Sequence, residues 1–292
     1  MNKEKILKAG QIAKQVKEYI RPLVKKNMSL LELAEKIESK IEELGGKCAF
    51  PCNLSIDNIA AHFTPSHDDK TLATGLLKVD FGVHVDGWVA DNAFSIDLEN
   101  NEENKKLIEA SKKALDAASK IIKTKIFTSK IGEIVEKTIE SYSFTPVINL
   151  SGHEIDHYDL HAGLTIPNTK NAKEVLVKEG LYAVEPFAST GTGKVHDGKP
   201  STIYQLQDER NVRSPIAREI LDHIIEEYQT LPFCSRWLVK KFGTKALFGL
   251  KQLEENGNLH QYPQLVEKPG VKISQAENTF LVEKDKVTVT SE

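Results

Sequence analysis

The stretch Leu76–Ile96, LLKVDFGVHVDGWVADNAFSI, contains the pattern that organises the chain. Apolar side chains alternate with other residues on both sides of Asp86-Gly87, as expected of two half-buried β-strands. The Asp-Gly pair is a strong signal for a two-residue hairpin turn. With the turn there, Asp80 and Asp91 become diagonal neighbours on one face, about 7 to 8 Å apart at the backbone.

This register brings two carboxylates together. Gly82 lies opposite Asp91, and Asp80 lies opposite Ala93. At that separation two negative charges repel by about 2 kcal/mol at an effective dielectric constant of about 20. Solvent compensates for such repulsion on an ordinary exposed face, whereas one or two divalent cations would do so in a metal site. The hairpin alone does not decide between these interpretations.

Composition narrows the classes of protein to consider. The 292 residues are 40% hydrophobic and 28% charged, as is typical of a globular protein. A net charge of −3 argues against nucleic acid or an anionic membrane as the main partner. The three cysteines, Cys48, Cys52 and Cys234, are too few and too scattered for a disulfide framework. With no apolar leader and no long apolar window, the expected location is the cytoplasm.

Helical periodicity predicts four helices around this hairpin. Apolar residues between Ile6 and Ile20 recur at intervals of three and four, and this helix should end by Pro22. A capping box at Ser29 and Glu32 begins a second helix over about 29–44. Two more helices are expected at about 102–123 and 129–142. The stretch 49–65 reads as irregular and carries a histidine, His62, of the kind that usually lies on a surface.

The sequence VINLSGHEIDH contains the zinc-protease pattern H-E-x-x-H at His153, Glu154 and His157. That pattern binds zinc only on a helix, and the preceding VINLSG is typical of a strand and a turn. A third ligand would have to come from a downstream residue such as Glu179. These features argue against a zinc protease of this class.

Two glutamates stand in apolar strand-like sequence in the second half of the chain. Glu185 immediately precedes Pro186 in LYAVEPFAST, and Glu277 is expected in the middle of a strand. Each could lie on an exposed face, but a buried carboxylate needs a partner. Between them, residues 213–266 are rich in helical pattern and end like the helix-to-wing junction of a winged helix. We interpret this segment as a structural insertion, because it has no basic excess.

The acidic and histidine residues form a set that suits a pair of divalent ions such as Co, Mn, Fe(II) or Zn. They are Asp80, Asp91, His153, Glu185 and Glu277. Their surroundings, DFGVHVDGWVADNA, LSGHEI, AVEPFAST and SQAENTF, resemble the methionine aminopeptidases of the M24 metallopeptidases over nearly the whole chain. The segments AAHFTP and LHAG and the helical insertion resemble the type 2 subfamily of archaea and eukaryotes.

The resemblance implies an α+β pita-bread fold, with a central antiparallel sheet between two pseudo-twofold halves. Residues 1–212 and 267–292 would form the catalytic domain, and 213–266 the winged-helix-like insertion. The implied activity is removal of the initiator methionine from nascent proteins with a small second residue, by attack of a metal-bridging water on the first peptide bond. A cytoplasmic monomer is expected, and whether it acts at the ribosome is open.

Residue roles follow from the same resemblance. Asp80 would bind one ion, His153 and Glu185 the other, and Asp91 and Glu277 both. His62 and His161 would contact the peptide and stabilise the tetrahedral intermediate, and Glu185 would also pass a proton to the leaving amine. The residues implied to line the pocket for the first side chain are Phe50, Leu160, Phe187 and His196.

One departure from the family and two rival functions remain open. Asn278 stands where the family usually has histidine, and as a neighbour of Glu277 on a strand it should face away from the metals. His84 is a conceivable extra ligand, and His157 has no expected role. The rivals are a proline-type aminopeptidase or dipeptidase and a metal-free relative that binds RNA or the ribosome.

Overall fold

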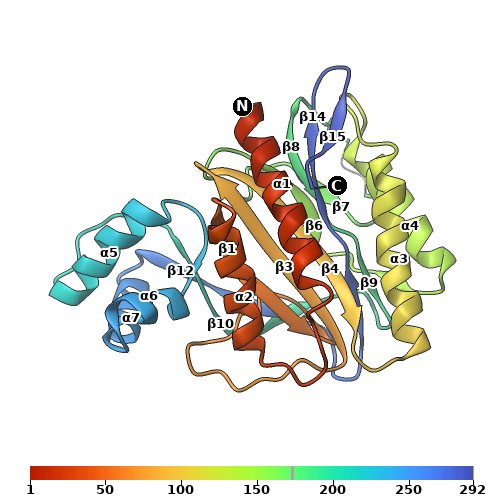
Figure 1. The fold of residues 1–292 in the computed structure, drawn as a ribbon. Coiled ribbons are helices and arrows are strands. Elements are labelled where there is room, and N and C mark those ends of the chain that lie inside the picture. The colour runs from red at the N-terminus through yellow and green to blue at the C-terminus, as the bar shows by residue number, and fades with distance from the viewer. Residues whose placement is uncertain (172–173, 292) are drawn as a thin grey trace.

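The computed structural model describes residues 1–171 and 174–291, which form an α+β structure (Figure 1). The helices are α1 (Lys3–Ile20), α2 (Leu30–Glu43), α3 (Glu102–Ser119), α4 (Thr128–Ser141), α5 (Pro215–Glu227), α6 (Ser235–Phe242) and α7 (Lys245–Glu255). The first eight strands are β1 (Lys47–Ile56), β2 (Ile59–Ala61), β3 (Leu76–Val85), β4 (Trp88–Asp97), β5 (Thr145–Pro146), β6 (Ser151–Ile155), β7 (Thr165–Pro167) and β8 (Gly180–Val184). The others are β9 (Phe187–Ser189), β10 (His196–Leu206), β11 (Phe233–Cys234), β12 (Leu259–Val266), β13 (Ile273–Gln275), β14 (Asn278–Val282) and β15 (Val287–Val289).

The first half of the molecule packs α1 and α2 against the antiparallel sheet β1-β3-β4 (Figure 1). Both helices turn their apolar stripes inward, so Ile12, Val16 and Ile37 join Val79 and Phe81 in one core. The first helix ends ahead of Pro22, as the sequence predicts. This half therefore presents the other face of the β3–β4 hairpin to the rest of the chain.

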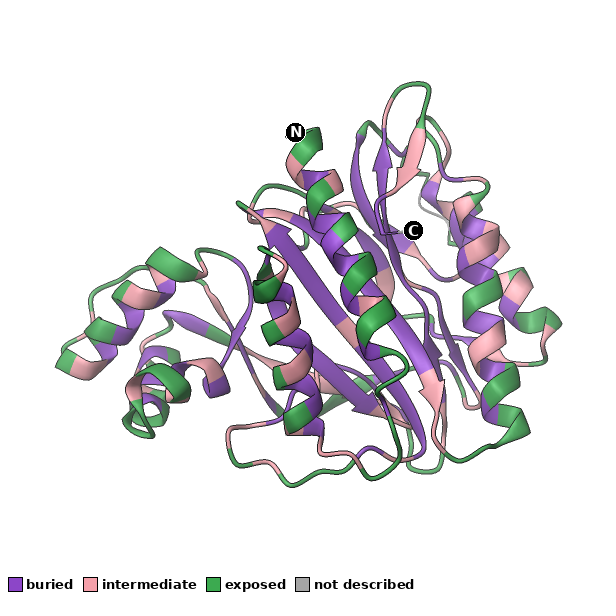
Figure 2. Cartoon of the chain, viewed as in Figure 1, coloured by how far each residue is buried: buried purple, intermediate pink, exposed green. Residues whose placement is uncertain are grey.

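The second half repeats the order of two helices followed by antiparallel strands. Helices α3 and α4 lie together on the right of Figure 1, against strands β8, β9 and β14. Those strands belong to two antiparallel sheets, of order β13-β9-β5 and β15-β14-β8-β6-β7. The strands are buried along most of their length, and exposed residues gather on the outer faces of the helices (Figure 2). No helix in the described residues is long and apolar enough to cross a membrane.

Two expectations about the backbone are wrong. The third helix ends at Ser119, not near Lys123, because the chain turns there while still burying Ile122. The stretch 49–65 is mostly strand, not irregular, since β1 pairs with β3 over its length. Its register shifts on either side of Phe50, and this irregularity, next to Pro51, masks the alternation that would identify a strand.

Residues 213–266 contain three helices with a core of their own. Apolar side chains of α5, α6 and α7, among them Ile220, Leu238 and Leu250, form one cluster with Phe233 and Tyr204. The segment is not entirely helical, because its last eight residues form β12, which pairs with β10 and with β2 of the first half. Residues 213–266 are thus joined to the first half by a strand pairing.

Candidate metal centre and active site

The β3–β4 hairpin has the expected register. Asp86 and Gly87 both have positive φ, 46° and 80°, as a tight turn of this kind requires. Gly82 pairs with Asp91 and Asp80 with Ala93. The two aspartates consequently share the face that is turned away from α1 and α2, and the carboxylate of Asp91 lies almost fully buried.

The second half supplies the other candidate ligands from three neighbouring strands. His153 lies within β6 and pairs with Ala183 of β8, which ends one residue before Glu185. Glu277 is not in the middle of a strand, as the sequence suggests, but at the break between β13 and β14. There its backbone N–H donates to the carbonyl of Ala93 at 3.0 Å. The break allows the chain to pass from one sheet to the next. The hydrogen bond to Ala93 ties the two halves of the molecule together at the site.

These five side chains converge. His153 Nε2 lies 3.7 Å from Asp91 Oδ2 and 3.9 Å from Glu185 Oε1. Ligand atoms of Asp91, His153 and Glu277 all lie within 4.8 Å of one another, a spacing that could hold a metal ion. Asp80 joins them through a shared neighbour, the Gln275 amide.

The electrostatics of this cluster fit a cation. Burial, and then the neighbouring carboxylates, raise the pKa values of Asp91, Glu185 and Glu277, and burial raises that of Asp80 to about 7. One buried oxygen on each of Asp80, Asp91 and Glu277 has no hydrogen-bond partner in the described structure. Burial lowers the pKa of His153 to about 3, so its imidazole is neutral and can donate a lone pair. Carboxylate oxygens and one imidazole nitrogen are suitable ligands for hard or borderline divalent ions.

A cavity of about 300 Å³ opens beside the five side chains. Phe50, Leu160 and Phe187 form part of its apolar lining, as the resemblance implies. Gly82 makes room for the first of these, because a Cβ there would lie 2.4 Å from Phe50 Cε1. His196 is exposed at the start of β10 and is not among the described residues that line the cavity, so the structure does not support its expected place in the pocket.

His62 and His161 both line this cavity. His62 has a left-handed backbone, with φ of 64°, and its Nδ1 lies 3.1 Å from the carbonyl of Pro263. A carbonyl only accepts hydrogen bonds, so Nδ1 carries the proton and Nε2 of the neutral ring is the acceptor. Burial lowers the pKa of His62 to about 4, and that of His161 is also lowered by burial. The ring of His161 packs edge-on against His153, with centroids 4.5 Å apart.

The zinc-protease pattern does not form a site of its own. Its first three residues lie on a strand, so Glu154 faces away from His153, and its carboxylate accepts from the N–H of Leu164. His157 Nε2 instead contacts the carbonyl of Asp86 at 2.8 Å. The helix that this class of zinc site requires is absent from these described residues, in agreement with the sequence argument against a zinc protease.

Two other polar residues near the candidate ligands, Asn278 and His84, form hydrogen bonds away from the cavity. Asn278 is buried on the opposite face of β14, where its Oδ1 accepts from Lys17 Nζ and Ser291 Oγ, both at 3.4 Å. The departure from the family at this position therefore points away from the cavity, as expected. His84 Nδ1 accepts from the N–H of Gly87 at 3.0 Å, and His84 is not among the described residues that line the cavity.

Sequence reasoning missed Gln275. Its Nε2 lies 3.4 Å from one oxygen each of Asp80, Glu185 and Glu277, and its side chain is almost fully buried. The available signal was its position two residues before Glu277, which suggests that the two share a face. A donor among three carboxylates orients them for a cation.

Replacing Gln275 with methionine is expected to weaken divalent-metal affinity about 10- to 100-fold, because methionine keeps the volume but removes the amide donor. Calorimetric titration of the metal-stripped protein with a divalent ion measures this affinity. Gln205→Met, on the partly exposed strand β10, is the matched control. Unchanged affinity in the Gln275 variant would show that the amide does not orient the ligands.

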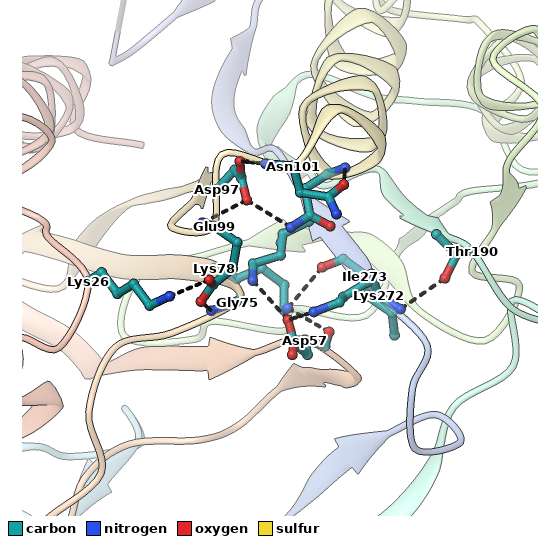
Figure 3. Close-up of polar contacts among 12 residues, drawn as sticks. Lys26, Asp57, Gly75, Lys78, Asp97, Glu99, Asn101, Thr190, Lys272 and Ile273 are labelled. Atoms are coloured by element: carbon teal, nitrogen blue, oxygen red, sulfur yellow. Dashed lines mark hydrogen bonds and ion pairs between the residues drawn. The ribbon is translucent and has the colours of Figure 1, made fainter.

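A second polar cluster joins β3 and β13 beyond the site (Figure 3). Buried Lys78 donates from Nζ to the carbonyls of Asp57 and Ile273, at 3.1 and 2.9 Å. The Asp57 carboxylate accepts from the N–H of Leu76 and forms an ion pair with Lys272. Burial lowers the pKa of Lys78 to about 7. The cluster fixes the relative position of the two strands that lead to Asp80 and to Glu277.

Comparison with known proteins identifies the family. The sequence profile of metallopeptidase family M24 matches residues 4–219. A methionine aminopeptidase of Pyrococcus horikoshii is 44% identical over 297 residues, covering 100% of both chains. The chain belongs to metallopeptidase family M24 and, within it, to the methionine aminopeptidases. As an M24 metallopeptidase, it is a hydrolase that uses divalent metal.

Solved structures agree with this fold. A methionine aminopeptidase from Thermotoga maritima has a TM-score of 0.71 at 18% identity, covering 99% of this chain and 96% of that one. A structure described as a thermophilic Arx1 has a TM-score of 0.84 at 17% identity, covering 98% and 90%. At such identities these likenesses show the fold alone, which is the pita-bread fold of methionine aminopeptidases.

Proposed function

We propose that this methionine aminopeptidase removes the initiator methionine from new polypeptides, using two divalent ions held by five residues. The observation that supports this most directly is the convergence of four carboxylates and one imidazole beside an apolar cavity. The relatives' name supplies the substrate class. Cobalt, manganese, iron(II) and zinc all suit these ligands, and availability would select among them.

The five side chains would divide between the two ions by position. Asp80 would bind one ion, and His153 and Glu185 would bind the other. Asp91 and Glu277 would bind both, because each is buried with a ligand atom near His153 and each interacts electrostatically with Asp80. Bound divalent ions would polarise the scissile carbonyl and lower the pKa of a water molecule.

The protein's own residues would bind the peptide and move the proton. Phe50, Leu160 and Phe187 would hold the methionine side chain in the apolar part of the cavity. His62 offers its Nε2 lone pair to an N–H of the peptide, and His161 would stabilise the tetrahedral intermediate. Glu185 would pass a proton to the leaving amine.

Shape would set the preference for methionine. An apolar pocket gains only about 1 to 3 kcal/mol per methylene, so leucine and methionine differ modestly in binding energy. We further propose a cytoplasmic monomer that acts on nascent chains, with a catalytic domain of residues 1–212 and 267–292 and an insertion of 213–266.

Peptide cleavage distinguishes this activity from the proline-type rival. With added Co or Mn, the protein is expected to release methionine from Met-Ala-Ser and to leave an X-Pro dipeptide intact, because the cavity accepts an extended apolar first side chain. Chromatography of the free amino acids measures both. Cleavage of the X-Pro peptide alone, or no cleavage of Met-Ala-Ser with metal present, would contradict the assignment. Failure of the purified protein to bind metal would favour the metal-free binding-protein rival.

A further inference from the structure

Arg236, at the start of α6 in the insertion, is almost fully buried. Its Nη1 and Nη2 donate to the two carboxylate oxygens of Glu38 on α2, at 2.6 and 2.9 Å. Its Nε donates to the carbonyl of Pro65 at 3.0 Å, and Nη2 also reaches Thr64 Oγ1 at 3.3 Å. One guanidinium therefore joins the insertion, the second helix and the segment that follows His62.

The partner carboxylate is fully engaged as well. Glu38 Oε1 accepts from the backbone N–H of Cys52 at 3.3 Å, and Oε2 accepts from the indole N–H of Trp237 at 2.9 Å. A buried ion pair needs such additional hydrogen bonds to offset its desolvation. Even so, pairs of this kind stabilise a fold little compared with apolar side chains of the same volume. Stability alone is therefore a weak reason for this arrangement.

The segment that Arg236 holds begins with a strained residue. A left-handed backbone at a non-glycine residue such as His62 is strained and persists only where its surroundings impose it. Thr64 and Pro65, two and three residues further on, are fixed by Arg236. On the other side, the carbonyl of Pro263 in β12 accepts from the His62 ring. Both restraints come from residues 213–266.

We propose that the insertion positions His62, and that Arg236 is the positioning residue through which α6 does so. Arg236 does not line the cavity in the described structure, so it acts through the His62 backbone and not on the substrate. This inference rests on the proposed catalytic role of His62. It gives the insertion a function within the aminopeptidase reaction itself.

A double-mutant cycle tests the proposal. Arg236→Met removes the guanidinium, and Glu38→Gln in the same protein removes the buried charge while keeping one oxygen that can accept from Cys52 or Trp237. This pair is expected to lower kcat/KM for Met-Ala-Ser about 10- to 100-fold, because small displacements of a catalytic group carry losses of that size. In a His62→Ala background the same pair should change kcat/KM less than about twofold, because residues acting as one unit are not additive.

Controls separate positioning from folding. Arg218→Met on the exposed face of α5 should leave kcat/KM unchanged, and bound metal should be equal in all variants. If the double replacement does not fold, Arg236→Lys, which retains a charge opposite Glu38, takes its place. Its effect on kcat/KM is then compared in the same way, with His62 present and in the His62→Ala background. Equal losses in both backgrounds, or no loss with His62 present, would overturn the proposal. Full activity of His62→Ala alone would instead overturn the catalytic role of His62.

Discussion

Replacing Glu277 with glutamine is expected to lower kcat/KM for Met-Ala-Ser by about three orders of magnitude. The side chain lies at the break between β13 and β14, buried among the other carboxylates, and one of its oxygens has no protein partner. Glutamine keeps the shape but removes the charge that would hold both ions. Losing the stabilisation of the transition state by bound metal costs several kcal/mol, and each 1.4 kcal/mol corresponds to about a tenfold change in rate.

The matched control is Glu154→Gln. This glutamate would be the general base of a zinc protease, yet it faces away from His153 and accepts from the N–H of Leu164. Its replacement should change kcat/KM less than about threefold. Steady-state kinetics with saturating metal, together with metal analysis of both variants, make the comparison. Loss of activity in the Glu154 variant with activity retained in the Glu277 variant would reverse the assignment.

Replacing Asp91 with asparagine is expected to abolish activity and yet to stabilise the metal-free protein. Burial and the neighbouring carboxylates raise the pKa of Asp91, so the metal-free fold bears the cost of holding an uncompensated acid there. Removing that cost should stabilise the metal-free protein by about 2 kcal/mol, or raise its melting temperature by ~5 °C. Adding metal should raise the melting temperature of the unmodified protein above that of the variant, because ions stabilise only a protein that binds them.

Calorimetric melting with and without chelator measures this reversal. Asp285→Asn, at the exposed turn before β15, controls for the general effect of removing one negative charge. That variant should melt within about 1 °C of the unmodified protein in both conditions, as surface substitutions usually do. A metal-free Asp91→Asn protein that melts below the unmodified one would mean that the carboxylates do not repel one another.

Local signals in the sequence are sufficient to predict that Asp80 and Asp91 lie together, the two candidate ligands that the first half of the molecule supplies. The Asp86-Gly87 turn and the alternation around it determine a register, and that register places Asp80 and Asp91 together. The helices that carry clear apolar stripes and caps were likewise predictable, because periodicity and capping are properties of neighbouring residues. Strand β1 was not, since its pairing with β3 is interrupted on both sides of Phe50.

Long-range contacts account for what the sequence did not show. Gln275 takes its role from three carboxylates that arrive from other strands, and Arg236 meets Glu38 across 198 positions of sequence. No local pattern encodes such pairs. Only the resemblance implies a place in the pocket for His196, which is exposed at the start of β10 and is not among the described residues that line the cavity.

The two-metal mechanism is tested most directly by the release of free methionine from Met-Ala-Ser as a divalent ion is returned to the chelator-stripped protein. The two-metal mechanism predicts no release from the stripped protein and recovery that reaches its plateau at two equivalents of metal. It also predicts that Asp91→Ala shows no recovery at any metal concentration. Methionine release that persists after stripping, or that recovers fully in Asp91→Ala, would contradict it.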